Sequence, residues 1–179
     1  NTMGVSVSAA FAVVNRIDDF AYTPQQNIAH AMTSLMAQSK GAGKKGRLKE
    51  AFRCGMRIEF VYALIIFSVC FFFATPLLNL FTKDTEVISH GVKYLKLIAV
   101  MYFLPAATNG IQGYFRGIGD LKITLISSFI NMGVRVLAAA ILVCCFSFEI
   151  EALPYSYLAG WIGMLVAELP LLVKSYTNY

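Results

Sequence analysis

The sequence predicts an all-α integral membrane protein, a bundle of five transmembrane helices. Its composition is 58% hydrophobic and only 14% charged, whereas a soluble domain has roughly 45–50% apolar and about 25% charged residues. Five long segments, four of them strongly apolar, follow one another and are separated by short polar stretches. About 20 helical residues cross the ~30 Å hydrocarbon core of a bilayer, so each segment is long enough to span a membrane.

The first expected span, residues 5–38, is longer and more polar than a simple span requires. Its periodicity still favours a helix, with water or protein along one side. The remaining expected spans are apolar and cover residues 58–81, 94–114, 123–148 and 155–173. Every backbone polar group inside a bilayer has to be paired within the protein, which favours helices for all five segments.

The charges of the connections predict which helix ends lie in the cytoplasm, because short cytoplasmic loops carry an excess of Lys and Arg. The connection after the first span, residues 39–57, is strongly basic, and the third connection carries Arg116 and Lys122. The fourth connection carries Glu149 and Glu151 and no base. The first and third connections and the C-terminal end are therefore expected inside.

Polar side chains recur at three- and four-residue steps in three spans, which places each set on one helical face. In the first span these are Arg16, Asp19, Thr23, Gln26, His30 and Thr33, flanked by Asp18 and Tyr22. In the third and fourth spans they are Tyr102, Pro105, Asn109, Gln112 and Arg116, and Thr124, Ser127, Asn131 and Arg135. Such residues usually face a water-filled path, so the three stripes predict a wet central cavity. Interhelical hydrogen bonding that holds the bundle together is the alternative for each of them.

Some polar residues of the first span have a second interpretation. Arg16 and Asp19 could pair across one turn and neutralise each other, without any role in transport. His30 could shuttle protons near neutral pH, but a packed or interfacial imidazole is the commoner use of such a residue.

The last span carries one acidic residue and an aromatic cluster. Glu168 is expected to reach the cytoplasmic side and meet Lys174, which makes it a weak candidate for a coupling carboxylate. Tyr155, Tyr157 and Trp161 predict an aromatic belt at the outer membrane interface. A drug-stacking group is the alternative for these rings.

No sequence pattern indicates an enzyme, a metal site or a cofactor. Cys54, Cys70, Cys144 and Cys145 lack the CxxC spacing of zinc sites, and we expect them to pack as small apolar residues. The basic residues lie between hydrophobic runs and form no basic domain of the kind that binds nucleic acid. Membrane lipid and small molecules are therefore the expected partners.

Two connections resemble signatures of the multidrug and toxic compound extrusion (MATE) family. Residues 38–43 (QSKGAG) are similar to the family's Q-x-x-G-A-G pattern, and residues 116–120 (RGIGD) to its R-G-x-G-D turn. The signature residues are Gln38, Gly41 and Gly43, and Arg116, Gly117, Gly119 and Asp120. Residues 15–20 (NRIDDF) also resemble the polar centre of the family's eighth helix.

The resemblance covers nearly the whole chain and implies helices eight to twelve of a twelve-helix, two-lobe transporter. Residues 1–179, which begin with Asn1 and not Met, are accordingly expected to form part of the C-terminal lobe. The N-terminal lobe is then the main protein partner. The implied location is the bacterial cytoplasmic membrane, crossed several times.

The family resemblance implies a secondary antiporter that exports organic cations in exchange for Na⁺ or H⁺ by alternating access. On this hypothesis Asp18 and Asp19 attract the cations, and Arg16 tunes their charge. Adaptable polar contacts come from Tyr22, Gln26, His30, Asn109, Gln112, Asn131 and Arg135. Residues 103–112 contain no acidic residue, whereas some sodium-coupled members carry one there.

Two other functions remain open. A lipid-linked oligosaccharide flippase of the same superfamily would need a strongly cationic cavity, to which Arg16, Arg116 and Arg135 would contribute. A non-transporting membrane enzyme or scaffold is the more distant alternative, and the sequence offers it no nucleophile–base pair.

Overall fold

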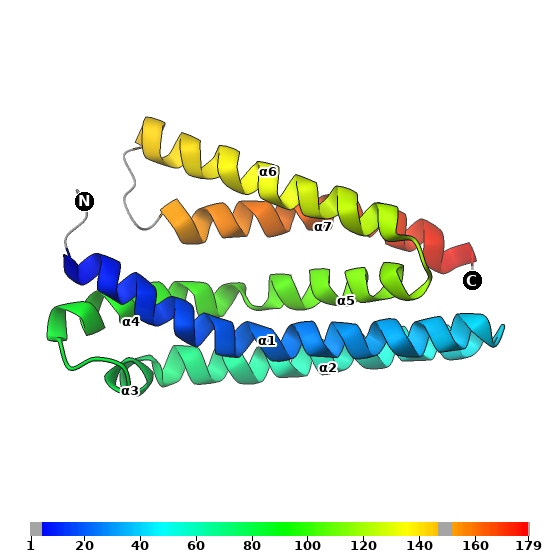
Figure 1. Cartoon of the computed structure of the whole chain (residues 1–179), viewed down its shortest axis with the longest axis horizontal. Helices are drawn as coiled ribbons and strands as arrows, with labels where there is room; N and C mark the ends of the chain where they lie inside the picture. The colour runs from blue at the N-terminus through cyan, green and yellow to red at the C-terminus, as the bar shows by residue number, and fades with distance from the viewer. Residues whose placement is uncertain (1–4, 147–151, 179) are drawn as a thin grey trace.

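The computed structural model describes residues 5–146 and 152–178, and all regular structure in these residues is helical, which confirms the predicted all-α class (Figure 1). In chain order the helices are α1 (Val5–Gly41), α2 (Lys45–Phe72), α3 (Ala74–Asn79), α4 (Thr85–Met101), α5 (Phe103–Gly117), α6 (Leu121–Phe146) and α7 (Ala152–Asn178).

The helices form two groups that run roughly parallel to one long axis (Figure 1). Helix α1 packs against α2, α4 and α5, and these helices make up the larger group. Helices α6 and α7 pack tightly against each other as a hairpin, which contacts the larger group chiefly through α5. The α1–α2 and α5–α6 connections lie at one end of the bundle, which we call the basic end because residues 44–47 and 116–122 carry its Lys and Arg residues.

Within residues 5–146 and 152–178, three helices are long and apolar enough to cross a membrane, namely α2, α6 and α7. Helices α4 and α5 meet the same test only as a pair, and they are bent by 41° at the break between them. Helix α1 has 37 residues but is more polar and is not among these spans. The prediction of an integral membrane protein is thus supported, while the predicted number of five spans is not confirmed.

The second helix differs from its expected bounds of 58–81 at both ends. Helix α2 begins at Lys45, inside the stretch that its basic charges predicted to be a loop, because Leu48 is buried against the C-terminal part of α5. It ends at Phe72, and α3 follows after Phe73. Pro76 explains this break, since it has no N–H to donate to the carbonyl of Phe72 four residues earlier.

The expected span 94–114 is also divided. Helix α4 begins earlier, at Thr85, where the side chain of Asp84 accepts hydrogen bonds from the backbone N–H groups of Glu86 (2.9 Å) and Val87 (3.4 Å). It ends at Met101, and α5 begins at Phe103. Helices α6 and α7 lie close to their expected positions, although residues 147–148 of the expected fourth span are outside the described residues.

Both signature sequences end a helix in the same way. Gly43 (φ 67°) and Gly119 (φ 83°) adopt left-handed backbone conformations, which glycine enters without steric cost. In each turn an N–H reaches back five residues, from Lys44 to Ser39 (3.0 Å) and from Asp120 to Phe115 (2.9 Å). These are Schellman motifs, and they turn the chain tightly at both connections.

The two signature turns also contact each other. The Lys40 ammonium of the first donates a hydrogen bond to the carbonyl of Ile118 in the second. The basic end therefore joins residues 78 positions apart in the sequence. This contact fixes the C-terminal end of α1 beside the start of the α6–α7 hairpin.

Helices α1 and α5 approach closely at Gly113, and this contact generates a stability prediction. A Cβ atom at Gly113 would lie 2.9 Å from the carbonyl oxygen of Ala29, which is backbone and cannot rotate away. We expect Gly113→Val to destabilise the protein by about 1–3 kcal/mol through overpacking. The measurement is the temperature at which the detergent-solubilised protein loses its monodisperse peak.

Gly133→Val on α6 is the matched control, because no other atom lies within 4 Å of a Cβ at that position. Equal melting temperatures for the two variants would show that α1 and α5 do not approach each other as described.

Candidate functional site

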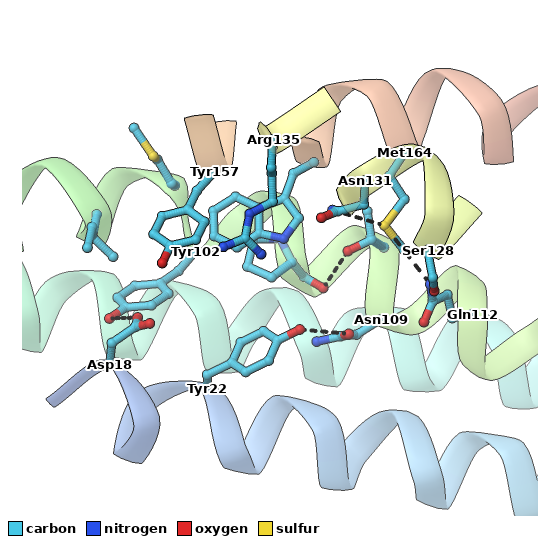
Figure 2. A pocket seen from close by; sticks show the side chains of 15 residues that line it. Asp18, Tyr22, Tyr102, Asn109, Gln112, Ser128, Asn131, Arg135, Tyr157 and Met164 are labelled. Carbon is cyan, nitrogen blue, oxygen red and sulfur yellow. Dashed lines mark hydrogen bonds between the residues drawn. The ribbon is translucent and has the colours of Figure 1, made fainter. Parts of the chain in front are cut away.

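A cavity of about 380 Å³ lies between the two helix groups (Figure 2). Its polar lining consists of Asp18, Tyr22, Thr108, Asn109, Gln112, Ser128, Asn131 and Arg135. Its apolar and aromatic lining consists of Ile98, Met101, Tyr102, Pro105, Tyr157, Trp161 and Met164. Side chains from α1, α4, α5, α6 and α7 thus converge on one space, as expected for a ligand site between helices of a bundle.

The wall formed by α1 carries the negative charge of the cavity. Asp18 accepts a hydrogen bond of 2.9 Å from the hydroxyl of Tyr102. One turn further, the hydroxyl of Tyr22 donates to Oδ1 of Asn109 at 3.3 Å. The buried Nδ2 of Asn109 has no hydrogen-bond partner among the described residues, so the cavity wall contains an unpaired donor.

The break between α4 and α5 positions Tyr102 beside Asp18. Pro105 cannot donate to the carbonyl of Met101, so the helix cannot continue regularly through this point. The carbonyl of Tyr102 accepts from the N–H of Ala106 (3.3 Å) and from Nε2 of Gln25 on α1 (3.3 Å). Gln25 is completely buried, and its side chain therefore holds the break against α1.

The hairpin supplies a positive charge and an aromatic wall. The guanidinium carbon of Arg135 lies 4.0 Å from the centre of the Tyr157 ring, within the range of a cation–π interaction. The ring centroids of Tyr157 and Trp161 are 6.0 Å apart. Figure 2 shows Arg135 directed from α6 toward Tyr157, with Asp18 on the opposite side of the cavity.

Met164 on α7 joins the polar residues of α5 and α6. Its sulfur accepts from Nδ2 of Asn131 at 3.4 Å and lies 4.0 Å from Nε2 of Gln112. A thioether is a weak acceptor, so a ligand can replace these contacts at small cost.

The chain was also compared with known proteins. The MatE family model matches residues 1–141. The chain belongs to the MatE family. This result confirms the resemblance that the two signature sequences carried.

The MatE relatives among curated proteins include a "Probable multidrug resistance protein YoeA" of Bacillus subtilis, 27% identical over 180 residues. A "Probable multidrug resistance protein NorM" of Thermotoga maritima is 24% identical over 162 residues, or 90% of this chain. A "FAD transporter" of Shewanella oneidensis is 24% identical over 67% of this chain. The chain spans 37%, 34% and 27% of these relatives, respectively, which is about a third of their length.

Solved structures of MATE transporters share the fold. A crystal structure of a MATE protein in the bent conformation has a TM-score of 0.88 at 15% identity, over 94% of this chain and 38% of that chain. The MATE transporter ClbM in complex with Rb⁺ has a TM-score of 0.81 at 19% identity, over 96% of this chain and 39% of that chain.

The MatE fold brings together only some of the residues that the sequence proposed for the pathway. Those that line the cavity are Asp18, Tyr22, Asn109, Gln112, Asn131 and Arg135. Those on the exposed face of α1, outside the cavity lining, are Arg16, Asp19, Gln26 and His30. Successive helical residues are about 100° apart, so Asp18 and Asp19 point to different surroundings.

The aromatic residues of α7 also differ from expectation. Tyr157 and Trp161 both line the cavity, which favours the alternative of a ring-stacking group over an interfacial belt. Tyr155, two residues earlier, is 39% exposed and is not part of the lining.

Sequence reasoning overlooked one buried carboxyl group, that of Glu59, and misplaced another, that of Glu168. Glu59 on α2 and Glu168 on α7 are both 0% exposed, and none of their carboxyl oxygens has a hydrogen-bond partner among the described residues. The expected contact of Glu168 with Lys174 is wrong, since Lys174 is exposed whereas Glu168 points into the bundle. The spacing of Trp161, Met164 and Glu168 on one helical face was the signal that could have placed it inward.

No group of three or more His, Cys, Asp or Glu residues within 5–146 and 152–178 is arranged to hold a metal ion.

The position of the cavity predicts which residues of α6 meet water. Asn131 lines the cavity, while its neighbour Met132 is 69% exposed on an apolar face that also carries Leu125 and Phe129. In a variant without native cysteines, we expect Asn131→Cys to react at least about tenfold faster than Met132→Cys with a membrane-impermeant thiol reagent, because the reactive thiolate needs water.

The measurement is the rate of labelling in membranes, followed by mass spectrometry. Comparable rates at the two adjacent positions would mean that the hairpin does not present Asn131 to a wet cavity.

Proposed function

We propose that this chain forms part of one lobe of a secondary antiporter that exports organic cations in exchange for Na⁺ or H⁺ by alternating access. The observation that carries the proposal is the placement of Asp18 opposite an aromatic wall in a cavity between two helix groups. Binding sites near the midplane, between structural units that move against each other, are typical of secondary transporters.

The cavity suits an aromatic or alkylated cation. Asp18 supplies the counter-charge, and the hydroxyl of Tyr102 orients its carboxylate. The ring faces of Trp161 and Tyr157 can make cation–π contacts, each of which contributes roughly 0.5–2 kcal/mol of binding free energy, depending on solvent exposure. The volume of about 380 Å³ falls within the usual range of about 300–1,000 Å³ for small-molecule pockets. Met101 and Met164 are flexible, which favours broad specificity.

Arg135 competes with the transported cation for a place in this site. Its guanidinium occupies the face of Tyr157 that an incoming cation would also prefer. A bound cation therefore replaces Arg135 on the ring, and Arg135 moves away by rotation of its side chain. This competition limits the affinity of the cavity for the cation. A moderate affinity suits a transporter, because it has to release the cation after transport.

The charge of the cavity argues against the flippase alternative. Among the described lining residues Asp18 is acidic and Arg135 is basic, so their charges balance. Arg16 and Arg116, which would have made the cavity cationic, are not in the lining. A diphosphate headgroup would need more positive charge than this lobe provides.

A flavin-like aromatic anion is the second candidate for the same site, because one relative is named as a FAD transporter. Trp161 would stack on the flavin ring and Arg135 would bind a phosphate. Asp18 would repel this ligand, so its removal separates the two candidates.

The exposed polar face of α1 is also part of the proposed transport pathway. Four polar residues of this face are exposed and lie outside the cavity lining, and we place the second lobe against them: Arg16, Asp19, Gln26 and His30. The remaining parts of the proposal are that the transporter needs no cofactor, contacts membrane lipid and lies in the bacterial cytoplasmic membrane with its basic end inside.

Neutralising Asp18 tests the function directly. In the intact transporter that contains this chain, we expect Asp18→Asn to weaken binding of ethidium by about tenfold or more, equivalent to about 1.4 kcal/mol. The measurement is fluorescence anisotropy of ethidium in detergent. Export in proteoliposomes under separate Na⁺ and H⁺ gradients then identifies the coupling ion.

Glu86→Gln is the control, since it removes one negative charge at an exposed position in the first turn of α4. Unchanged ethidium affinity in Asp18→Asn would contradict the assigned role. Tighter FAD binding in Asp18→Asn, without any ethidium binding to either protein, would favour the second candidate.

A further inference from the structure

Glu168 lies between the cavity and the basic end of the bundle. It follows Met164, which lines the cavity, by four residues, or about 5–6 Å along α7. Gln112, which also lines the cavity, faces its carboxyl group, together with Ser127 on α6 and Arg116 on α5. Residues from α5 and α6 thus face this carboxyl group of α7 just beyond the cavity.

The polar side chains around Glu168 do not donate to its carboxyl group in the arrangement described. The three polar neighbours direct donors elsewhere: Ser127 to the carbonyl of Thr124 (3.2 Å), Gln112 toward the sulfur of Met164 (4.0 Å), and Arg116 through Nε to the carbonyl of Gln112 (3.2 Å). Neither carboxyl oxygen has a hydrogen-bond partner among the described residues. A buried carboxylate without partners costs several kcal/mol, roughly, whereas a neutral acid avoids most of this cost.

The same neighbours can accept a charged carboxylate after small rotations. Arg116 is half-buried, and its terminal guanidinium nitrogens could form a bidentate pair with a carboxylate. Ser127 and Gln112 each have a donor that can turn toward it. Side-chain rotations alone would therefore give the charged carboxylate the partners that it lacks in the arrangement described.

Most other titratable groups around α7 have partners of their own. On α6, Arg135 stacks on Tyr157; on α5, Tyr114 shares a hydrogen bond with Ser175; on α2, Arg53 donates to Tyr176 and Lys49 lies over the ring of Tyr176. On α4, the ring of Tyr94 packs against Phe11, and its buried hydroxyl has no hydrogen-bond partner among the described residues; Asp18 is bound to Tyr102 across the cavity. Arg116 is therefore the charged group that can rearrange when Glu168 gains or loses its proton.

We propose that Glu168 is the group of this lobe that takes up and releases a proton during transport, with Arg116 as the cation that pairs with it after release. The proposal rests on the antiport function proposed above and assigns H⁺ as a coupling ion. When an organic cation enters the cavity, the O–H bond of Glu168 breaks, its electron pair stays on the carboxylate, and the proton passes to water at the basic end. Glu168 takes up a proton again from the outer side, through the cavity, before or as the cation is released there, so that one proton moves inward in each cycle.

The surroundings of Glu168 also connect this step to movement. Pro170 interrupts the hydrogen bonds of α7 two residues later, so the helix can bend there. Beyond it, Arg53 and Tyr114 fix the last turns of α7 through Tyr176 (3.0 Å) and Ser175 (3.1 Å). Recruitment of Arg116 to Glu168 would alter the turn that joins α5 to this hairpin.

Proton release on binding tests the proposal in the intact transporter. Wild-type protein in weakly buffered detergent should release about one proton for each ethidium bound, and its affinity should fall by up to about tenfold per pH unit on acidification, by linkage. Glu168→Gln, which mimics the neutral acid, should still bind ethidium with release reduced to near zero. Glu59→Gln, at the other fully buried carboxyl group, should release protons as the wild type does.

Binding of ethidium without proton release by the wild type, or equal release by Glu168→Gln, would overturn the proposal. Failure of the wild type to bind ethidium or FAD would instead contradict the proposed function.

A second measurement needs no variant, so it tests the proposal even if Glu168→Gln does not fold. Dicyclohexylcarbodiimide modifies protonated carboxyl groups in apolar surroundings, and mass spectrometry separates Glu168 from Glu59 in one sample. We expect modification of Glu168 to slow at alkaline pH and on addition of ethidium, with no effect of ethidium at Glu59. Modification of Glu168 that responds neither to pH nor to ethidium would overturn the proposal independently of transport.

Discussion

The structure depends on the requirement that a backbone carbonyl inside a bilayer find a donor within the protein. Pro105 removes the donor for the carbonyl of Met101 in the middle of the α4–α5 pair, and Gln25 on α1 adds a second donor at the neighbouring carbonyl of Tyr102. This buried contact holds the bend next to Asp18. The cavity is therefore a consequence of the break, because a straight helix would not present the Tyr102 side chain to Asp18 in this way.

The two ends of the bundle have different roles. Toward the basic end an apolar cluster that includes Met36, Leu48, Tyr114 and Phe115 packs α1, α2 and α5 together and also contacts α7. The cavity lies on the other side of this cluster. Closing one end and leaving a polar cavity beyond it is what alternating access requires of each state, and Glu168 lies between the two regions.

Much of this arrangement could be predicted from the sequence. Composition and hydropathy gave the membrane class, and the spacing of Asn109, Gln112, Asn131 and Arg135 identified two cavity-lining faces. Helix α1 was harder, because it is polar on more than one side and only tertiary packing decides that Asp18, and not Asp19, faces the cavity. The breaks at Pro76 and Pro105 could have been predicted from the missing N–H groups. The early start of α2 could not, because it depends on burial of Leu48 against a distant segment.

The central claim is that organic cations bind between Asp18 on α1 and the aromatic wall of α7. The most direct test is a structure of the intact transporter with a bound aromatic cation that carries a heavy atom, located by its anomalous signal. The account predicts a peak between the carboxylate of Asp18 and the Trp161 ring, with Arg135 displaced from Tyr157. A peak against the exposed face of α1, near Asp19 and His30, with the cavity empty, would contradict it.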